Sequence, residues 1–215
     1  MGCYTEFKAK MKNYGIRIHR QSAVESFLRI MKASNSDILD WYGMTLKHLR
    51  PNEQLFLRFC KVTGIRKAEA ITSFNKIIEL SKIKDLPAYY DYQLKVLMHF
   101  RYHKEFLRRT KNCYISFVPD NLVNEITSSQ PVSYYAIKCR LRKQGIKLRI
   151  NELRDYFGTN LRKYGIRKEE IDLLQGRIPQ EIFIRHYWSP KLSELRDRIL
   201  KTLEPINYLP ISQTL

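Results

Sequence analysis

The 215-residue sequence lacks several features that would assign it to common classes of protein. No stretch approaches 18 consecutive apolar residues and no N-terminal stretch has the layout of a signal peptide, so we expect no membrane partner. The four cysteines have no CxxC spacing, which argues against zinc and favours free thiols in a reducing, intracellular setting. His99 and His103 are four residues apart, but a metal site needs three or four ligands. We therefore expect neither a metal nor another cofactor.

Acidic residues are also scarce. There are 21 Asp and Glu against 39 Lys and Arg, which gives a formal net charge of +18 and a pI near 9.8. Such an excess implies a polyanionic partner, and most simply a nucleic acid. The basic residues are spread along the chain instead of concentrated in a tail, so we expect the folded surface itself to carry the charge. This distribution favours a protein that lies on double-stranded DNA.

The spacing of the apolar residues predicts a mainly α fold with a small antiparallel β-sheet, an α+β class. Proline and glycine separate the predicted helices, which cover residues 22–31, 37–49, 51–62, 67–80, 133–143, 151–164, 168–175, 180–187 and 191–203. Two runs of β-branched and aromatic residues, 92–100 and 113–118, predict strands around the basic turn 108–112.

We expect three parts along the chain. Residues 1–19 form an N-terminal lead-in, residues 20–203 form the main domain, and residues 204–215 form a C-terminal tail. The tail holds two prolines and no charge after Glu204, which is typical of an extended arm or a segment that docks on a partner.

Two arginines and a late tyrosine suggest chemistry on a phosphodiester. Arg66 follows Thr63-Gly-Ile, Arg154 follows Leu153, and the segment that holds Tyr187 begins at Leu173, twenty residues after Leu153. Cleavage of a phosphodiester builds negative charge at phosphorus, and arginine can hold that charge with two parallel hydrogen bonds. A tyrosine can serve as a covalent nucleophile that conserves the bond energy for rejoining.

The order and spacing of these segments resemble the tyrosine recombinase (phage integrase) family, and most closely the integrases of archaeal viruses and plasmids. Thr63-Gly-Ile-Arg66-Lys-Ala-Glu69 resembles the first box of the family, and Leu153-Arg154 with the following Tyr-Phe-Gly-Thr-Asn-Leu161 resembles the second. The resemblance implies that Arg66 and Arg154 are the two catalytic arginines, and that Glu69 supports Arg66.

The same resemblance supplies the remaining site residues. The basic turn resembles the element that carries the catalytic lysine, so Lys111 is the predicted general acid and Lys104 its competitor. Gln175-Gly-Arg177 resembles the archaeal form of a further family element, in which Arg177 stands where others have His or Trp. His186-Tyr187 completes the pattern, with Tyr187 as nucleophile and His186 in support or merely packed.

Two departures from the family pattern stand out. Three residues before the second arginine, where the family has His or Lys, this chain has Asn151, which can donate to a phosphoryl oxygen but cannot carry charge. Lys147 or Arg149 could replace the missing group. Only about twenty residues precede the first predicted helix, so we expect a fragment of a larger integrase or a minimal one without a core-binding domain.

The resemblance implies a site-specific DNA recombinase that forms a 3′-phosphotyrosyl intermediate without metal or ATP. The active form would be a homotetramer on two duplexes, with a monomer possible in free solution, and it would act on DNA in the cytoplasm of a host cell. Two alternatives remain open. One is a DNA-binding accessory remnant that has lost activity, and the other is a relaxase similar to type IB topoisomerases.

Overall fold

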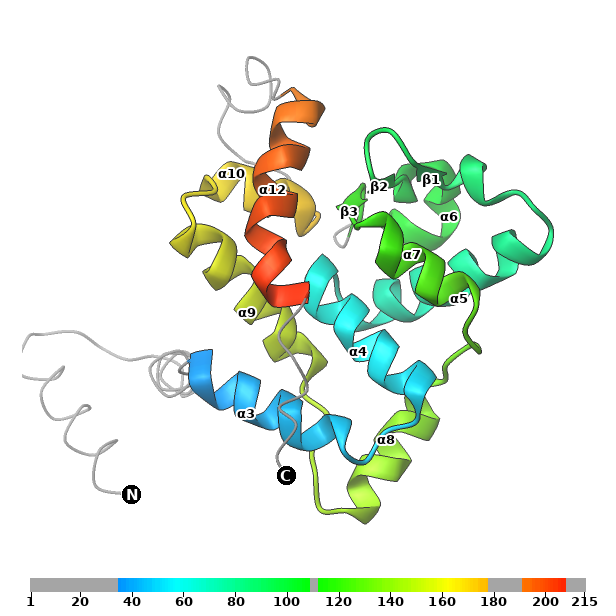
Figure 1. Ribbon diagram of the computed structural model, residues 1–215, viewed down its shortest axis with the longest axis vertical. Helices are drawn as coiled ribbons and strands as arrows, with labels where there is room; N and C mark the ends of the chain where they lie inside the picture. The colour runs from blue at the N-terminus through cyan, green and yellow to red at the C-terminus, as the bar shows by residue number, and fades with distance from the viewer. Residues whose placement is uncertain (1–34, 109–111, 178–190, 208–215) are drawn as a thin grey trace, which may run out of the picture. The chain divides into compact units, whose positions relative to one another are not determined.

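The computed structural model describes residues 35–108, 112–177 and 191–207, and the predicted helices at 22–31 and 180–187 lie outside these ranges. The chain divides into two units at residues 41 and 42, and everything below concerns the second unit, Tyr42–Leu215, apart from the start of α3. The helices, including the short 3-10 helices η1 and η2, are α3 (Asn35–Leu46), α4 (Pro51–Thr63), α5 (Lys67–Lys82), η1 (Leu86–Ala88), η2 (His99–Tyr102), α6 (His103–Phe106), α7 (Asp120–Thr127), α8 (Tyr134–Lys143), α9 (Ile150–Lys163), α10 (Lys168–Leu174) and α12 (Leu192–Asn207) (Figure 1).

The predicted fold class is confirmed, because the described residues are mainly helical with one small antiparallel sheet. Its strands are β1 (Tyr90–Asp91), β2 (Val96–Leu97) and β3 (Ser116–Phe117), in the order β1-β2-β3. Tyr90 lies opposite Leu97 in the first pair, and Leu97 lies opposite Ser116 in the second. None of the described helices is long and apolar enough to cross a membrane.

Only Val96–Leu97 of the strand predicted over residues 92–100 forms a strand, which is β2, and the rest of that prediction is wrong. The chain turns at residues 92–95, and Lys95 takes a positive φ of 51°. The Asp91 carboxylate accepts the backbone N–H groups of Gln93 and Leu94, both at 2.9 Å, and this local bonding closes a turn where aromatic content alone indicated a strand. Strand β2 follows this turn, and η2 and α6 come next, before β3 begins.

Local signals fix the limits of the central helices. Pro51 lies in the first turn of α4, where its missing N–H leaves no helical bond unmade. The Glu53 carboxylate accepts the Arg50 backbone N–H at 3.0 Å, which caps the same end. Gly64 ends α4 in the left-handed region at φ 58°, so the predicted limits of this helix are confirmed to within a residue.

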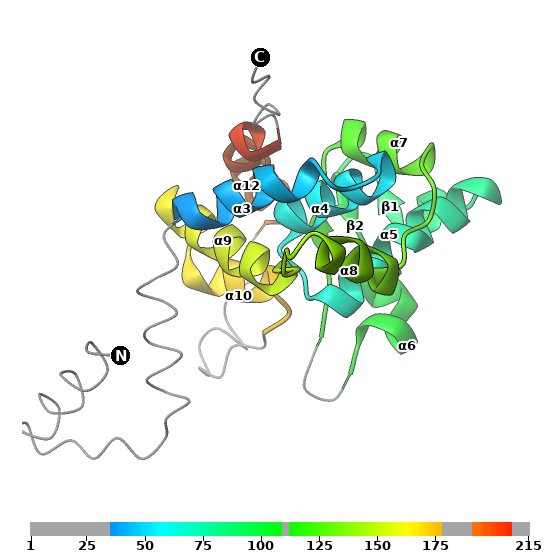
Figure 2. The same ribbon diagram turned by 90° about the horizontal axis from the view of Figure 1, so that it is seen from below.

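Helix α4 is the centre of the fold. It packs against α9 on one side and α5 on the other, an arrangement that both views show (Figures 1 and 2). Phe56 and Phe59 of α4 meet Phe74 of α5 edge to face, and all three rings are fully buried. Helix α9 packs in turn against α10, so α4, α9 and α10 are connected through direct helix contacts.

Two helices, α7 and α12, differ from the prediction. Helix α7 was not predicted, although Pro119 and Asp120 provide a start signal and Leu122, Val123 and Ile126 form its buried face. Helix α12 extends to Asn207, four residues beyond its predicted end, so the first residues of the predicted tail are helical. It buries Leu195, Ile199 and Leu203 and contacts α4 and β3 of its own chain.

Candidate functional site

Arg154 is the most constrained of the predicted site residues. It lies in α9 and is only 8% exposed. Its Nη1 donates to the Gly64 carbonyl at 3.0 Å and its Nη2 donates to the Gln175 carbonyl at 2.7 Å. The Gln175 side chain donates back to the Arg154 carbonyl at 3.1 Å. The two sides of the guanidinium are thus bonded to segments 90 and 21 residues away in sequence.

Arg66 lies at the N-terminal cap of α5, directly after the turn that ends α4. It is half-buried, and its Nη1 donates to the Asn112 carbonyl at 3.1 Å. The turn requires glycine at residue 64 for two reasons. Its φ is positive, and a Cβ there would lie 2.2 Å from the Phe157 ring of α9. This close approach of α4 to α9 brings Arg66 and Arg154 together.

Arg177 follows Gly176, at a second point where two backbone segments approach each other closely. Gly176 has a φ of 65°, and a Cβ at this position would lie 1.6 Å from the Asn112 carbonyl oxygen. The backbone of the Gln175-Gly-Arg177 turn therefore lies directly against Asn112, the residue that follows Lys111. The Arg177 side chain is largely exposed and pairs with Asp172 at 2.9 Å.

The three arginines share one electrostatic environment. The pKa of Arg154 is lowered to about 10, mainly because burial disfavours the charged form and further because Arg66 and Arg177 are positive neighbours. Arg154 nevertheless remains protonated at neutral pH. Burial raises the pKa of the Cys113 thiol, with Glu69 adding to the rise and Arg154 and Arg66 opposing it. The thiol is thus a neutral group among these charges.

The stem of the basic turn reaches this cluster. Leu107 and Asn112 form an antiparallel bridge, and the Arg108 N–H donates to Asn112 Oδ1 at 3.0 Å. The Arg108 guanidinium forms an ion pair with Glu69, whose side chain is 1% exposed. Glu69, the residue predicted to support Arg66, forms its ion pair with Arg108. The other Glu69 oxygen, Oε2, is buried and has no hydrogen-bond partner among the residues that the structure describes.

The remaining predicted residues fall into two groups. Lys111, His186 and Tyr187 lie outside the residues that the structure describes. Asn151 is exposed in the first turn of α9, one turn before Arg154.

The structure also places Lys147 and Arg149, the possible replacements for the charge missing at Asn151, and Lys104, the alternative to Lys111. Arg149 Nε donates to Glu152 at 2.7 Å, so its charge is already paired, and Lys147 is exposed. Lys104, the alternative to Lys111, is exposed on α6, whereas Asn112 beside Lys111 contacts Arg66.

His99 is a structural residue. It is fully buried, with Nδ1 2.6 Å from the Tyr89 hydroxyl and Nε2 2.9 Å from the Ser116 hydroxyl. His103 is exposed. Within the described ranges, no group of three His, Cys, Asp or Glu side chains is placed to hold a metal ion.

A basic surface adjoins the cluster. Helix α8 buries only Ile137 and Leu141, and residues 126–151 contain basic side chains and no acidic one. Tyr135 of this helix is 73% exposed. Tyr134 at its start lies under the Lys67 ammonium, 4.4 Å from the ring centroid, and Lys67 is the neighbour of Arg66. We call α8 and the loop to Arg149 the basic surface.

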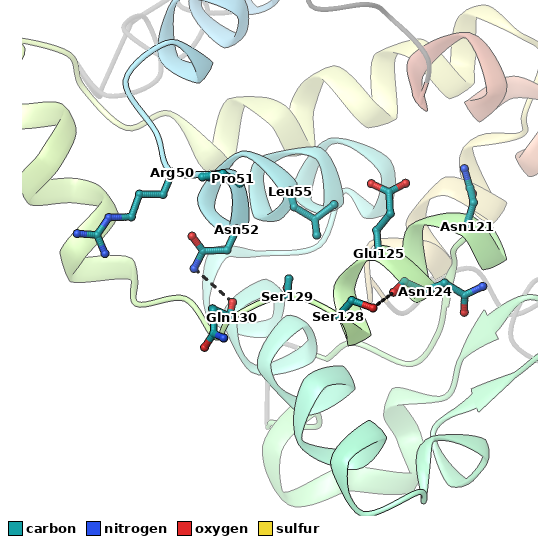
Figure 3. Close-up of a pocket in the computed structure, with 10 residues that line it drawn as sticks. All are labelled: Arg50, Pro51, Asn52, Leu55, Asn121, Asn124, Glu125, Ser128, Ser129 and Gln130. Carbon is teal, nitrogen blue, oxygen red and sulfur yellow. Dashed lines mark hydrogen bonds between the residues drawn. The ribbon is translucent and has the colours of Figure 1, made fainter.

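A separate groove lies between α4, α7 and the loop at 128–130 (Figure 3). Asn52 donates to the Gln130 and Pro131 carbonyls at 3.3 and 3.2 Å across it, and Ser128 donates to the Asn124 carbonyl. None of the residues that line this groove belongs to the predicted site. The cluster of arginines, and not this groove, is the candidate site.

The geometry brings arginines from three segments, Arg66, Arg154 and Arg177, into one cluster. Comparison with known proteins identifies the chain further: the model of the family described as archaeal phage integrase matches residues 31–197. The chain therefore belongs to the archaeal phage integrase family, as the sequence resemblance predicted. No curated protein and no solved structure matches it. Membership makes the chain an enzyme of the recombinase and integrase class with DNA as its partner.

Proposed function

We propose that the chain cleaves and rejoins DNA through a covalent 3′-phosphotyrosyl intermediate. The observation that supports this most strongly is the convergence of Arg66, Arg154 and the Gln175–Arg177 turn. Arg66 and Arg154 each bond to a neutral carbonyl, so their positive charges stay available for a phosphate. A guanidinium has five N–H donors, and these bonds leave others for the phosphoryl oxygens.

In the proposed reaction the Tyr187 hydroxyl oxygen attacks the scissile phosphorus and passes its proton to a solvent water as the P–O bond forms. The bond from phosphorus to the 5′ oxygen breaks, and the Lys111 ammonium protonates the departing oxygen. Arg66, Arg154 and Arg177 stabilise the charge on the non-bridging oxygens in the transition state. Rejoining reverses these steps with a 5′-hydroxyl from a partner strand.

Lys111 is favoured over Lys104 as the general acid. Asn112, the residue after Lys111, bonds to Arg66 and lies against Gly176. Lys104 is exposed on α6 and has no comparable neighbour among the residues that the structure describes.

The basic surface would add phosphate contacts, which supply affinity without sequence preference. We further propose a tetramer on two duplexes as the active form.

A covalent-capture experiment tests the reaction. Nicked duplexes with a random core are incubated with the protein, the mixture is denatured, and the DNA that remains attached is recovered and sequenced. We expect a protein–DNA adduct with the wild type and none with Tyr187→Phe. An adduct that persists in Tyr187→Phe would contradict Tyr187 as nucleophile.

The alternative function is a DNA-binding remnant without activity, and the observation that supports it is Asn151. Asn151 is exposed one turn before Arg154, where it brings no charge to a phosphate. An Asn151→His variant measures the deficit, because a rise in adduct yield would show an intact but weakened site. Failure of both proteins to form adduct, with DNA binding retained, would favour the remnant. Plasmid relaxation by a monomer would instead favour a relaxase.

A further inference from the structure

We propose that Arg108 is a positioning residue for Arg66, acting through Asn112. The inference rests on the proposed role of Arg66 in binding the scissile phosphate. It concerns a residue outside the predicted catalytic set, and it is carried by a chain of contacts that runs from Glu69 to Arg108, to Asn112 and to Arg66.

The chain begins at a buried charge. The Glu69 side chain is 1% exposed, and Arg108 is its ion-pair partner although the Arg108 side chain is itself 46% exposed. A buried carboxylate is strongly unfavourable unless a cation and hydrogen bonds compensate it. Glu69 belongs to the first turn of α5, so it is fixed in the same helix whose cap is Arg66. Arg108 is thereby held close to the start of that helix.

The second step joins Arg108 to Asn112. The Arg108 N–H donates to Asn112 Oδ1 at 3.0 Å, and the bridge between Leu107 and Asn112 closes the same stem. The Cys113 N–H donates to the Phe106 carbonyl at 2.9 Å one residue further along. These bonds all join residues 106–108 to residues 112–113. A shift of Arg108 would therefore move the Asn112 backbone with it.

The third step reaches Arg66. The Asn112 carbonyl accepts from Arg66 Nη1 at 3.1 Å, and the Gly176 backbone lies directly against the same carbonyl. The Glu69 carboxylate does not bond Arg66 directly. Glu69 therefore orients Arg66 through Arg108 and Asn112, the two residues of the stem. Loss of the Glu69–Arg108 pair should therefore misplace the Arg66 guanidinium without removing a charge from the phosphate itself.

The test measures single-turnover cleavage of a duplex recovered by covalent capture, for Arg66→Ala, Arg108→Gln and the double variant. A misplacement near 1 Å lowers rates by up to about 100-fold, and we expect Arg108→Gln to lose about tenfold. In the Arg66→Ala background, the same change should lose less than about twofold, because residues that act as a unit are not additive. Equal losses in both backgrounds would overturn the proposal and indicate a direct contact of Arg108 with DNA.

A second substrate separates this proposal from the proposed function. A methylphosphonate at the scissile position removes the charge that Arg66 is proposed to neutralise. We expect it to restore Arg66→Ala and Arg108→Gln relative to wild type. If Arg66→Ala is not restored, the phosphate role of Arg66 fails. If Arg66→Ala is restored and Arg108→Gln is not, only the positioning role fails.

Controls address folding. Arg108→Lys keeps a cation for Glu69 and should recover most of the activity, whereas Asn112→Ala, which removes no charge, should reproduce the selective defect of Arg108→Gln. Arg58→Gln removes a matched arginine from an ion pair with Glu125 outside the cluster and should cleave both substrates like the wild type. A uniform loss on both substrates in Arg108→Gln and Asn112→Ala would show a purely structural role and overturn the inference.

Discussion

Gly176 provides the sharpest test of how the arginines are assembled. Its φ is 65°, a region in which any other residue is strained, and a Cβ would lie 1.6 Å from the Asn112 carbonyl oxygen. Real Cβ atoms do not approach other atoms closer than 3.0 Å, so a Gly176→Ala variant must separate the two backbones by about 1.4 Å. Neither partner is a flexible side-chain end that could rotate away.

The expected magnitude follows from two terms. A left-handed conformation at a residue with a Cβ costs about 1–2 kcal/mol, and forcing two packed backbones apart costs about 1–3 kcal/mol more. We therefore expect Gly176→Ala to lower the free energy of unfolding by about 2–5 kcal/mol. Because Asn112 also bonds Arg66, cleavage by the protein that remains folded should fall by about 100-fold.

Gly165→Ala is the matched control. Gly165 also has a positive φ, of 81°, but a Cβ there meets nothing within 4 Å. Urea unfolding should therefore show the conformational term alone, about 1–2 kcal/mol, and adduct formation in folded protein should be unchanged. Equal destabilisation of the two variants, with equal adduct yield, would refute the reasoning that Gly176 sets the distance to Asn112.

Three further predictions follow from the same structure. Lowering the pH from 7 to 5 should destabilise the fold by about 2 kcal/mol through His99. Burial depresses the folded pKa of His99 to about 3, below its unfolded value of 6.5, so stability that is present above pH 6.5 is lost on acidification. Urea unfolding of His99→Gln should show a shallower decline of stability with falling pH. Arg154→Lys should cost about 1–3 kcal/mol, because one ammonium cannot replace both bonds to the Gly64 and Gln175 carbonyls; unchanged thermal melting would contradict it. Replacing Lys138 and Arg142 of the basic surface with Gln should reduce the salt slope of DNA binding by about 0.9 per lost phosphate contact, while Lys82→Gln on α5 should not change it.

Much of the fold could be predicted where local chemistry decides the outcome. Pro51 and Gly64 limit α4 for reasons that belong to those residues alone, and both limits are confirmed. The error at residues 92–100 arose because aromatic content measures burial as much as strand preference. The Asp91 side chain turned the chain there, and its bonding competes with the ladder at a single residue.

The candidate site was predictable only in part. Residue type and spacing indicated Arg66 and Arg154, because guanidinium chemistry is carried by the side chain, and the family resemblance added Arg177. Their bonding partners could not be predicted, since Gly64, Asn112 and Gln175 contribute backbone carbonyls that every residue possesses. Arg108 was missed as a partner of Glu69 for a related reason. The pair joins residues 39 apart in sequence, and only tertiary packing brings them together.

The choice of backbone carbonyls has a consequence for catalysis. A carboxylate partner would hold an arginine equally well but would cancel the charge that the phosphate needs. A carbonyl orients the guanidinium and leaves its full charge in place, and both Arg66 and Arg154 are held in this way.

Each of those carbonyls also belongs to a segment that carries another site residue. Gly64 precedes Arg66, Gln175 precedes Arg177, and Asn112 follows Lys111. Binding of phosphate to one arginine would therefore restrain the segments that supply the others. On this basis we expect substitutions within the cluster to be strongly non-additive.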